Sequence, residues 1–155
     1  MMNEQLKSSI DECVLCWLAT VDETGAPNVS PKEMFIHHEN GKLLIANIAS
    51  PISVRNLQGN PLVCVSLVEV FKQKGFKLKG TAAYIEPGHQ LFDGYRERLR
   101  SLGGDCFPIL GVIEVTISRV DKIIAPSYWM FPDKTTEDSQ VESAMQSYGV
   151  VPAHT

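Results

Sequence analysis

The sequence contains no uninterrupted apolar stretch long enough to cross a bilayer, and its first residues, MMNEQLKSSIDEC, lack the apolar core of a signal peptide. An excess of positive charge is also missing. The formal net charge of −4 argues against a chain whose main partner is nucleic acid or an anionic membrane. Internal repeats and low-complexity segments are absent. We therefore expect a cytoplasmic protein.

Composition argues against disorder and against several domains. Hydrophobic residues make up 44% and charged residues 21%, which are ordinary globular values. A chain of 155 residues is long enough for one domain with a hydrophobic core and too short for two domains of ordinary size. We expect one domain over residues 1–155, with a C-terminal tail over residues 126–155.

Cysteine is scarce, and its positions favour free structural thiols over disulfides, redox chemistry or a metal site. Cys64 lies inside an apolar run, and Cys13 and Cys16 lead into the strand-like CWLATV rather than a helix N-terminus, where a redox pair is expected. A zinc site needs a second pair of ligands, whereas Cys106 stands alone. The neighbours His37 and His38 would alternate across a strand, so we expect both to be surface or core residues.

What the sequence does contain is a series of short apolar, β-branched runs separated by turn residues. Asn40-Gly41 is typical of a tight hairpin turn because both residues tolerate positive φ. The prediction is a mainly β (α+β) fold, a small closed or partly closed antiparallel barrel with short flanking helices. The six predicted strands cover residues 14–21, 28–38, 42–47, 62–70, 75–86 and 111–125.

Helices are predicted from apolar residues at helical spacing. An N-terminal helix spans about residues 3–13, and a tail helix spans about residues 137–148, where Gly149 ends it. Between these, the stretch HQLFDGYRERLRSL forms an amphipathic helix that ends at Gly103-Gly104. Its apolar residues are Leu91, Phe92, Tyr95, Leu99 and Leu102.

The stretch NIASPISVRNLQGNP (47–61) interrupts the strands with a helix of barely two turns. Ser50 is suited to cap this helix and Pro51 to open it. The free amides and the positive dipole end of such a helix bind phosphate, and Ser53, Arg55 and Asn56 add hydroxyl, charge and amide groups. The alternative is an ordinary crossover helix with Arg55 in solvent.

Two other segments add local positive charge. FKQKGFKLKG (71–80) holds four of the nine lysines, and strand alternation places Lys77 and Lys79 on one face. This face is either a positive patch or an edge strand protected by lysines. In NVSPK (28–32), Pro31 removes a ladder hydrogen bond and Lys32 follows it directly, so a ligand could meet the backbone beside a cation.

The order of these motifs resembles the pyridoxamine 5'-phosphate oxidase-like family of FMN-binding split barrels. The resemblance covers about residues 12–86, with a weaker echo in APSYWMF and the tail. Four segments carry it: CWLATVDETGAPNVSPKEMFI, NGKLLIAN, SPISVRNLQGNPLVCVSLV and GFKLKGTAAYI.

The resemblance implies a six-stranded split barrel that forms a homodimer, with FMN bound at the interface and the tail helix packed there. In such proteins the strand matching Ser30, Pro31 and Lys32 follows the flavin ring and ribityl chain, and the strand end matching Ala46 and Asn47 lies nearby. The helix matching Ser50, Ser53, Arg55 and Asn56 receives the phosphate. Lys32 or a lysine of residues 74–79 would stabilise the reduced flavin, and Arg55 or a lysine of that strand would neutralise the phosphate. The cofactor-binding candidates of the lysine strand are Lys74, Gly75 and Lys77.

The sequence also departs from the vitamin-forming oxidases. Pro51-Ile52 stands where those enzymes have a basic pair, and no arginine follows Arg119 to hold a second phosphate. Pyridoxine phosphate is therefore not the expected substrate. Tyr128 and Trp129 would either cover the flavin by stacking or serve as core and interface residues.

Three functions remain open from the sequence. The first is an FMN-dependent oxidoreductase that acts on a small organic substrate, with the flavin as the redox group. The second is a non-catalytic FMN protein for electron transfer or flavin storage. The third is a barrel that binds single-stranded nucleic acid, which net charge disfavours, as does the alternation of Phe76 and Leu78 away from the lysines.

Overall fold

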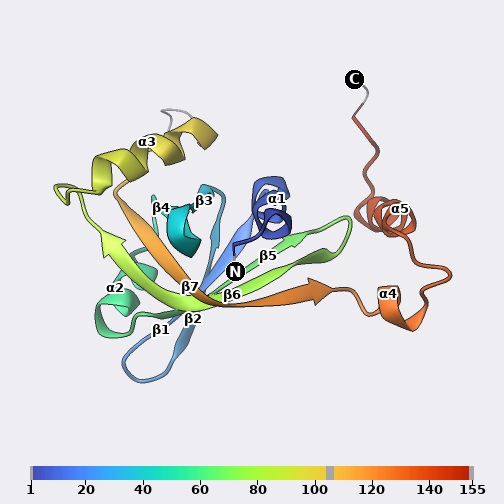
Figure 1. The fold of residues 1–155 in the computed structure, drawn as a ribbon, viewed down its shortest axis with the longest axis horizontal. Coiled ribbons are helices and arrows are strands. Elements are labelled where there is room, and N and C mark those ends of the chain that lie inside the picture. The colour runs from blue at the N-terminus through green and yellow to red at the C-terminus, as the bar shows by residue number, and fades with distance from the viewer. Residues whose placement is uncertain (1, 104–106, 154–155) are drawn as a thin grey trace.

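The structure is a computed structural model, and it describes residues 2–103 and 107–153. Seven strands and five α-helices are found in this part of the chain, with one 3-10 turn (Figure 1). The strands are β1 (Cys16–Val21), β2 (Pro27–Lys32), β3 (Phe35–His38), β4 (Lys42–Asn47), β5 (Leu62–Glu69), β6 (Lys74–Ile85) and β7 (Gly111–Ile124). The helices are α1 (Glu4–Glu12), α2 (Pro51–Gly59), α3 (Phe92–Gly103), α4 (Ser127–Met130) and α5 (Glu137–Tyr148), and the 3-10 turn is η1 (Glu39–Gly41).

All strands belong to one antiparallel sheet in the order β2-β1-β5-β6-β7-β4-β3, which confirms the mainly β, α+β fold class. The prediction of six strands was wrong in one detail, because residues 28–38 form two strands instead of one. β2 pairs with β1, whereas β3 pairs with β4. The chain changes partner at Glu33 and Met34, so a continuous strand cannot form there.

The two edge strands of this sheet, β2 and β3, are consecutive in the chain, and the sheet must therefore curl. Three residue steps separate Lys32 from Phe35, and an extended chain covers at most about 10 Å in three steps. The two edges of the sheet thus lie close together without pairing. We call this two-residue link, Glu33 and Met34, the seam.

Two helices cover the curled sheet and complete its core. Helix α1 buries Leu6 and Ile10, and α3 buries Phe92, Tyr95 and Leu99. The exposed positions of Leu91 and Leu102 correct the prediction that they belong to the apolar face of the third helix. The hairpin turn was predicted correctly, because Asn40 and Gly41 both adopt positive φ in η1.

A charged cluster fixes α3 to the sheet. The Tyr95 hydroxyl and the Lys42 amine both donate hydrogen bonds to the Glu114 carboxylate, and the Lys42 nitrogen lies 2.9 Å away. Burial alone raises the pKa of Glu114, but these two hydrogen bonds outweigh it, so the pKa lies below its usual value. Burial and then Glu114 raise the pKa of Tyr95 to about 12. The hydrogen bonds from Tyr95 and Lys42 thus explain why the Glu114 carboxylate is tolerated in a buried position under α3.

The C-terminal tail extends beyond the end of β7, away from the curled sheet (Figure 1). Its contacts with the sheet converge on the β5–β6 turn. Tyr128 donates to the Lys72 carbonyl (2.8 Å), and Lys74 lies 2.6 Å from the Glu137 carboxylate and 4.3 Å from the Tyr128 ring centroid. The tail helix has its predicted bounds, and Gly149 ends it in a left-handed conformation.

Large apolar side chains of the tail are exposed beside these contacts. Trp129 is 66% exposed, and Met130 and Phe131 follow it. Strand β7 ends at Ile124, and Tyr128 and Trp129 both belong to the short helix α4. In residues 2–103 and 107–153, no helix combines the length and the apolar character that a bilayer crossing needs.

Gly80 offers a test of the sheet geometry. The register between β6 and β7 shifts at Lys79 and Gly80, and a Cβ on Gly80 would lie 1.9 Å from the Thr116 carbonyl oxygen. We expect Gly80→Ala to lower the free energy of unfolding by about 1–3 kcal/mol, measured by urea denaturation. Gly94→Ala in α3 is the control, because a Cβ there meets nothing within 4 Å. Equal denaturation midpoints for the two variants would contradict this packing.

Candidate functional site

A hollow of about 250 Å³ opens at the seam, where β2, β4 and the start of α2 meet. We call it the Lys32 hollow. It brings together four of the residues that the sequence singled out, namely Pro31, Lys32, Ala46 and Ser50. The other lining residues are Glu33, Met34, Ile48, Ala49 and Phe107.

The Lys32 side chain is the main electrostatic feature of this hollow. The residue is only 6% exposed, and its amine donates hydrogen bonds to the hydroxyls of Ser30 and Ser50. Among the described residues it forms no ion pair with a carboxylate. Burial lowers the pKa of the Lys32 amine, and the Cys16 thiol opposes this shift. A buried cation without a countercharge is costly, so its presence points to an anionic ligand.

Helix α2 begins directly beside this amine. Pro51 has no amide hydrogen, and the Val54 amide donates to the Ser50 carbonyl (3.2 Å) as the first hydrogen bond of the helix. By helix geometry, the amides of Ile52 and Ser53 lack partners within the helix. The Ser50 side chain was expected to cap α2, but it makes no capping bond. It instead accepts from Lys32 and lies 3.3 Å from the Ser30 hydroxyl.

A chain of hydrogen bonds fixes the loop that leads into α2. The Asn47 side chain accepts from the Ser50 amide (3.1 Å) and donates to the Tyr84 hydroxyl (3.1 Å), which donates to the Leu110 carbonyl (3.2 Å). Asn47 therefore positions the phosphate-binding candidate Ser50 through the backbone. Gly111 makes room for Tyr84, because a Cβ there would lie 2.2 Å from the Tyr84 hydroxyl.

The remaining candidates on α2 point away from the Lys32 hollow. Ser53 and Asn56 are buried beneath the helix, where Asn28 donates to Ser53 (3.4 Å) and Asn56 donates to Thr20 (3.1 Å). These bonds hold α2 against β1 and β2. Arg55 is exposed and lines a separate hollow beside Asp22 and Glu23.

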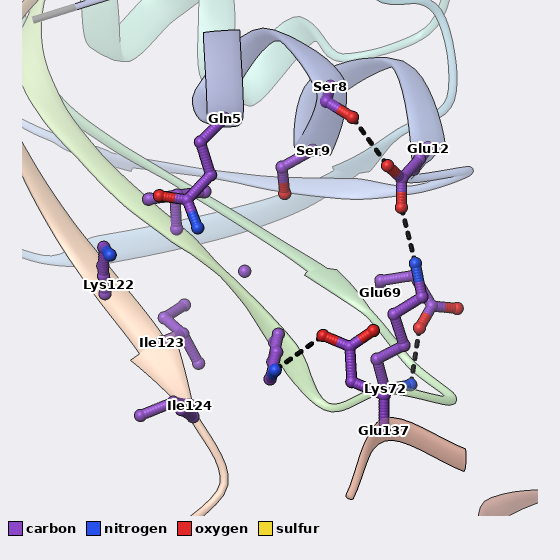
Figure 2. Close-up of a pocket in the computed structure, with 13 residues that line it drawn as sticks. Gln5, Ser8, Ser9, Glu12, Glu69, Lys72, Lys122, Ile123, Ile124 and Glu137 are labelled. Atoms are coloured by element: carbon purple, nitrogen blue, oxygen red, sulfur yellow. Dashed lines mark hydrogen bonds and ion pairs between the residues drawn. The ribbon is translucent and has the colours of Figure 1, made fainter. Parts of the chain in front are cut away.

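The lysine strand also lies apart from the Lys32 hollow. Lys74 and Gly75 line a hollow of about 510 Å³ between α1, the β5–β6 turn, β7 and α5, shown in Figure 2. Its cations are largely compensated, since Lys74 pairs with Glu137 and Lys72 pairs with Glu12 at 2.8 Å. Lys77 lines neither hollow. Lys122 also lines the larger hollow and makes no ion pair among the described residues, but it is exposed, whereas Lys32 is buried.

The described cysteines, Cys13, Cys16 and Cys64, are free thiols, as the sequence predicted. Burial raises the pKa of Cys13 to about 11 and that of Cys16 to about 12, so neither is a ready thiolate. Cys106 lies outside the described residues.

The histidines have structural surroundings as well. His37 lies 3.7 Å from the Asp11 carboxylate, and His38 packs edge-on against Tyr95 at 5.1 Å. Burial, and then Arg98, lower the pKa of His38. Neither histidine lines the Lys32 hollow.

Several lining residues were not anticipated from the sequence. Glu33 and Met34 directly follow the predicted Lys32, and Ile48 and Ala49 lie between the predicted Asn47 and Ser50, so proximity in sequence was an available signal. No local pattern marks Phe107. It approaches the site only because α3 returns the chain to the seam.

Comparisons with known proteins identify the family and the fold of this chain. The sequence profile described as pyridoxamine 5'-phosphate oxidase matches residues 2–123. No curated protein matches the chain. An FMN-binding protein from Syntrophomonas wolfei subsp. wolfei has a similar fold, with a TM-score of 0.67, 16% identity, and coverage of 79% of this chain and 86% of that one.

Two further structures share the fold. HupZ of Group A Streptococcus has a TM-score of 0.66 and 20% identity, covering 79% of this chain and 94% of that one. HutZ, the heme storage protein of Vibrio cholerae, has a TM-score of 0.62 and 22% identity, covering 77% and 93%. Because the family profile spans most of the sequence, the chain belongs to the pyridoxamine 5'-phosphate oxidase family.

Proposed function

We propose that the protein binds FMN, with the phosphate held at the Lys32 hollow, and that it is an oxidoreductase acting on a small organic substrate. The single observation that carries this proposal is the buried Lys32 amine, which has two hydroxyl neighbours and no carboxylate partner among the described residues. A phosphate dianion would supply the missing countercharge. Bound FMN would supply the redox chemistry.

The residues around Lys32 fit the parts of FMN. The phosphate would accept hydrogen bonds from Lys32, the hydroxyls of Ser30 and Ser50, and the free amides of Ile52 and Ser53. Ala46, Ile48 and Met34 offer an apolar wall for the flat ring system. In this assignment Lys32 takes the neutralising role, while Arg55 and Lys74 lie in other hollows.

The size of the Lys32 hollow supports a homodimer. About 250 Å³ is small for FMN, since sites that bury drug-sized molecules measure roughly 300–1,000 Å³. The outer face of β1 and β2 is also uncovered. Trp17 is 46% and Val29 57% exposed, and Trp17 stands opposite Pro31 of the hollow. A second copy on this face, with its tail packed at the interface, would bury this surface and enclose the flavin.

Two alternatives share the same site. A non-catalytic FMN protein for electron transfer or flavin storage requires every contact named above. HutZ, with the same fold, is a heme storage protein. No histidine among the described residues lines the Lys32 hollow, so a heme there would lack the commonest axial ligand.

Replacing Lys32 tests the phosphate assignment. We expect Lys32→Met to weaken FMN binding by about 1.5–3 kcal/mol, the range for hydrogen bonds to charged groups. The dissociation constants of FMN for the wild-type chain and for Lys32→Met are measured by the quenching of flavin fluorescence, in titrations at the same ionic strength. The methionine keeps the stem of the lysine in its buried position, which limits the loss of packing.

The matched control is Arg55→Ala, which removes a cation of the same charge from the neighbouring hollow. We expect its dissociation constant for FMN to change by less than about twofold, because exposed charges contribute little. A larger effect of Arg55→Ala than of Lys32→Met would place the phosphate at the other end of α2 and contradict the assignment.

Steady-state turnover distinguishes the oxidoreductase from the storage protein. The FMN-loaded protein should oxidise a reduced nicotinamide or a reduced deazaflavin in the presence of an electron acceptor, with the flavin absorbance bleaching and returning during the cycle. If the flavin stays bound and oxidised with every donor tried, the storage function holds instead.

A further inference from the structure

A second hollow of about 500 Å³ adjoins the Lys32 hollow across the seam. We call it the Asp11 hollow. The two share Glu33, Met34 and Phe107 as lining residues, so a single layer of side chains separates them. A molecule in the Asp11 hollow would therefore lie beside the site proposed for FMN.

The walls of the Asp11 hollow are mainly apolar. Ile10 and Cys13 line it from the N-terminal segment, Phe35 from β3 and Leu102 from the end of α3. Met34 is 8% exposed and packs against the end of α3, because a Cβ on Gly103 would lie 3.2 Å from its terminal carbon. Such walls suit the hydrocarbon part of a small ligand.

The charged groups of this hollow have one sign. Asp11 and Glu33 contribute two carboxylates, and no lysine or arginine is among its described lining residues. His37 lies 3.7 Å from Asp11 and compensates it when protonated, whereas Glu33 makes no ion pair within the described residues. Carboxylates repel an anionic substrate and attract a cationic one.

We propose that the Asp11 hollow is the substrate site and that it takes a small apolar molecule with a positively charged amine. This inference rests on the proposed FMN function, because it assigns the substrate of the same flavin. It also agrees with the lack of arginine after Arg119, because no C-terminal arginine is present to hold the phosphate of a phosphorylated substrate.

Three probes of the same size separate charge from shape. The FMN-loaded full chain is titrated with benzylamine, benzyl alcohol and benzoate, and the change in flavin absorbance reports binding. We expect benzylamine to bind about fivefold more tightly than benzoate, since an exposed ion pair contributes up to about that factor. Benzoate binding as tightly as benzylamine would overturn the proposal.

Charge-neutral variants test the two carboxylates. Asp11→Asn combined with Glu33→Gln should remove the preference for benzylamine over benzoate. Glu97→Gln is the control, because it removes one exposed charge from α3 outside the hollow. If the preference survives in the double variant, the hollow does not select the amine.

Amide NMR of the flavin-free chain measures amine binding independently of FMN binding. Benzylamine should shift the amide signals of Gly103 and Glu33, whether or not flavin is bound. Failure of the wild-type chain to bind FMN would end the proposed function and the substrate role with it, but shifted signals would still show that the hollow binds the amine. Unshifted Gly103 and Glu33 signals at saturating benzylamine would end the present inference alone.

Discussion

One buried ammonium group, that of Lys32, determines the electrostatics of the candidate site. Lys32 is placed in the interior of a curled sheet, with two serine hydroxyls as hydrogen-bond partners and no carboxylate among the described residues. Removing a charge from water without a countercharge costs several kcal/mol. Hydroxyls offset part of that cost, and the start of α2 adds further positive potential instead of relieving it. An anion at this point would interact favourably with the Lys32 amine, the serine hydroxyls and the start of α2 at the same time.

The sheet topology explains why the charge lies there. Because β2 and β3 are consecutive but form opposite edges, the seam interrupts the sheet, and the Lys32 hollow opens there. The same region receives the end of β4 and the first turn of α2, which Asn47 and Tyr84 hold in place. The seam also borders the Asp11 hollow. Cofactor and substrate would therefore meet across Glu33 and Met34. The link between β2 and β3 fixes the position of these two residues.

Much of the fold could be predicted from the sequence because local rules decide it. Asn40 and Gly41 supply the positive φ of the hairpin, and Gly149 ends α5 for the same reason. The division of residues 28–38 into two strands could not be predicted, since it depends on which strands pair across the sheet. On α2 the rotation of the helix about its axis decides which side chains face the hollow. This rotation buries Ser53 and Asn56 beneath the helix and directs Arg55 elsewhere, although sequence spacing alone groups all three with Ser50.

The central claim is that Lys32 and the start of α2 hold a phosphate, and the most direct measurement compares FMN with riboflavin, which differs only by lacking that group. Calorimetric titration of the flavin-free chain gives both dissociation constants under the same conditions. Two or more charge-assisted hydrogen bonds predict that FMN binds at least about 100-fold more tightly than riboflavin. Equal affinities would contradict the account, because the phosphate would then contribute nothing at Lys32.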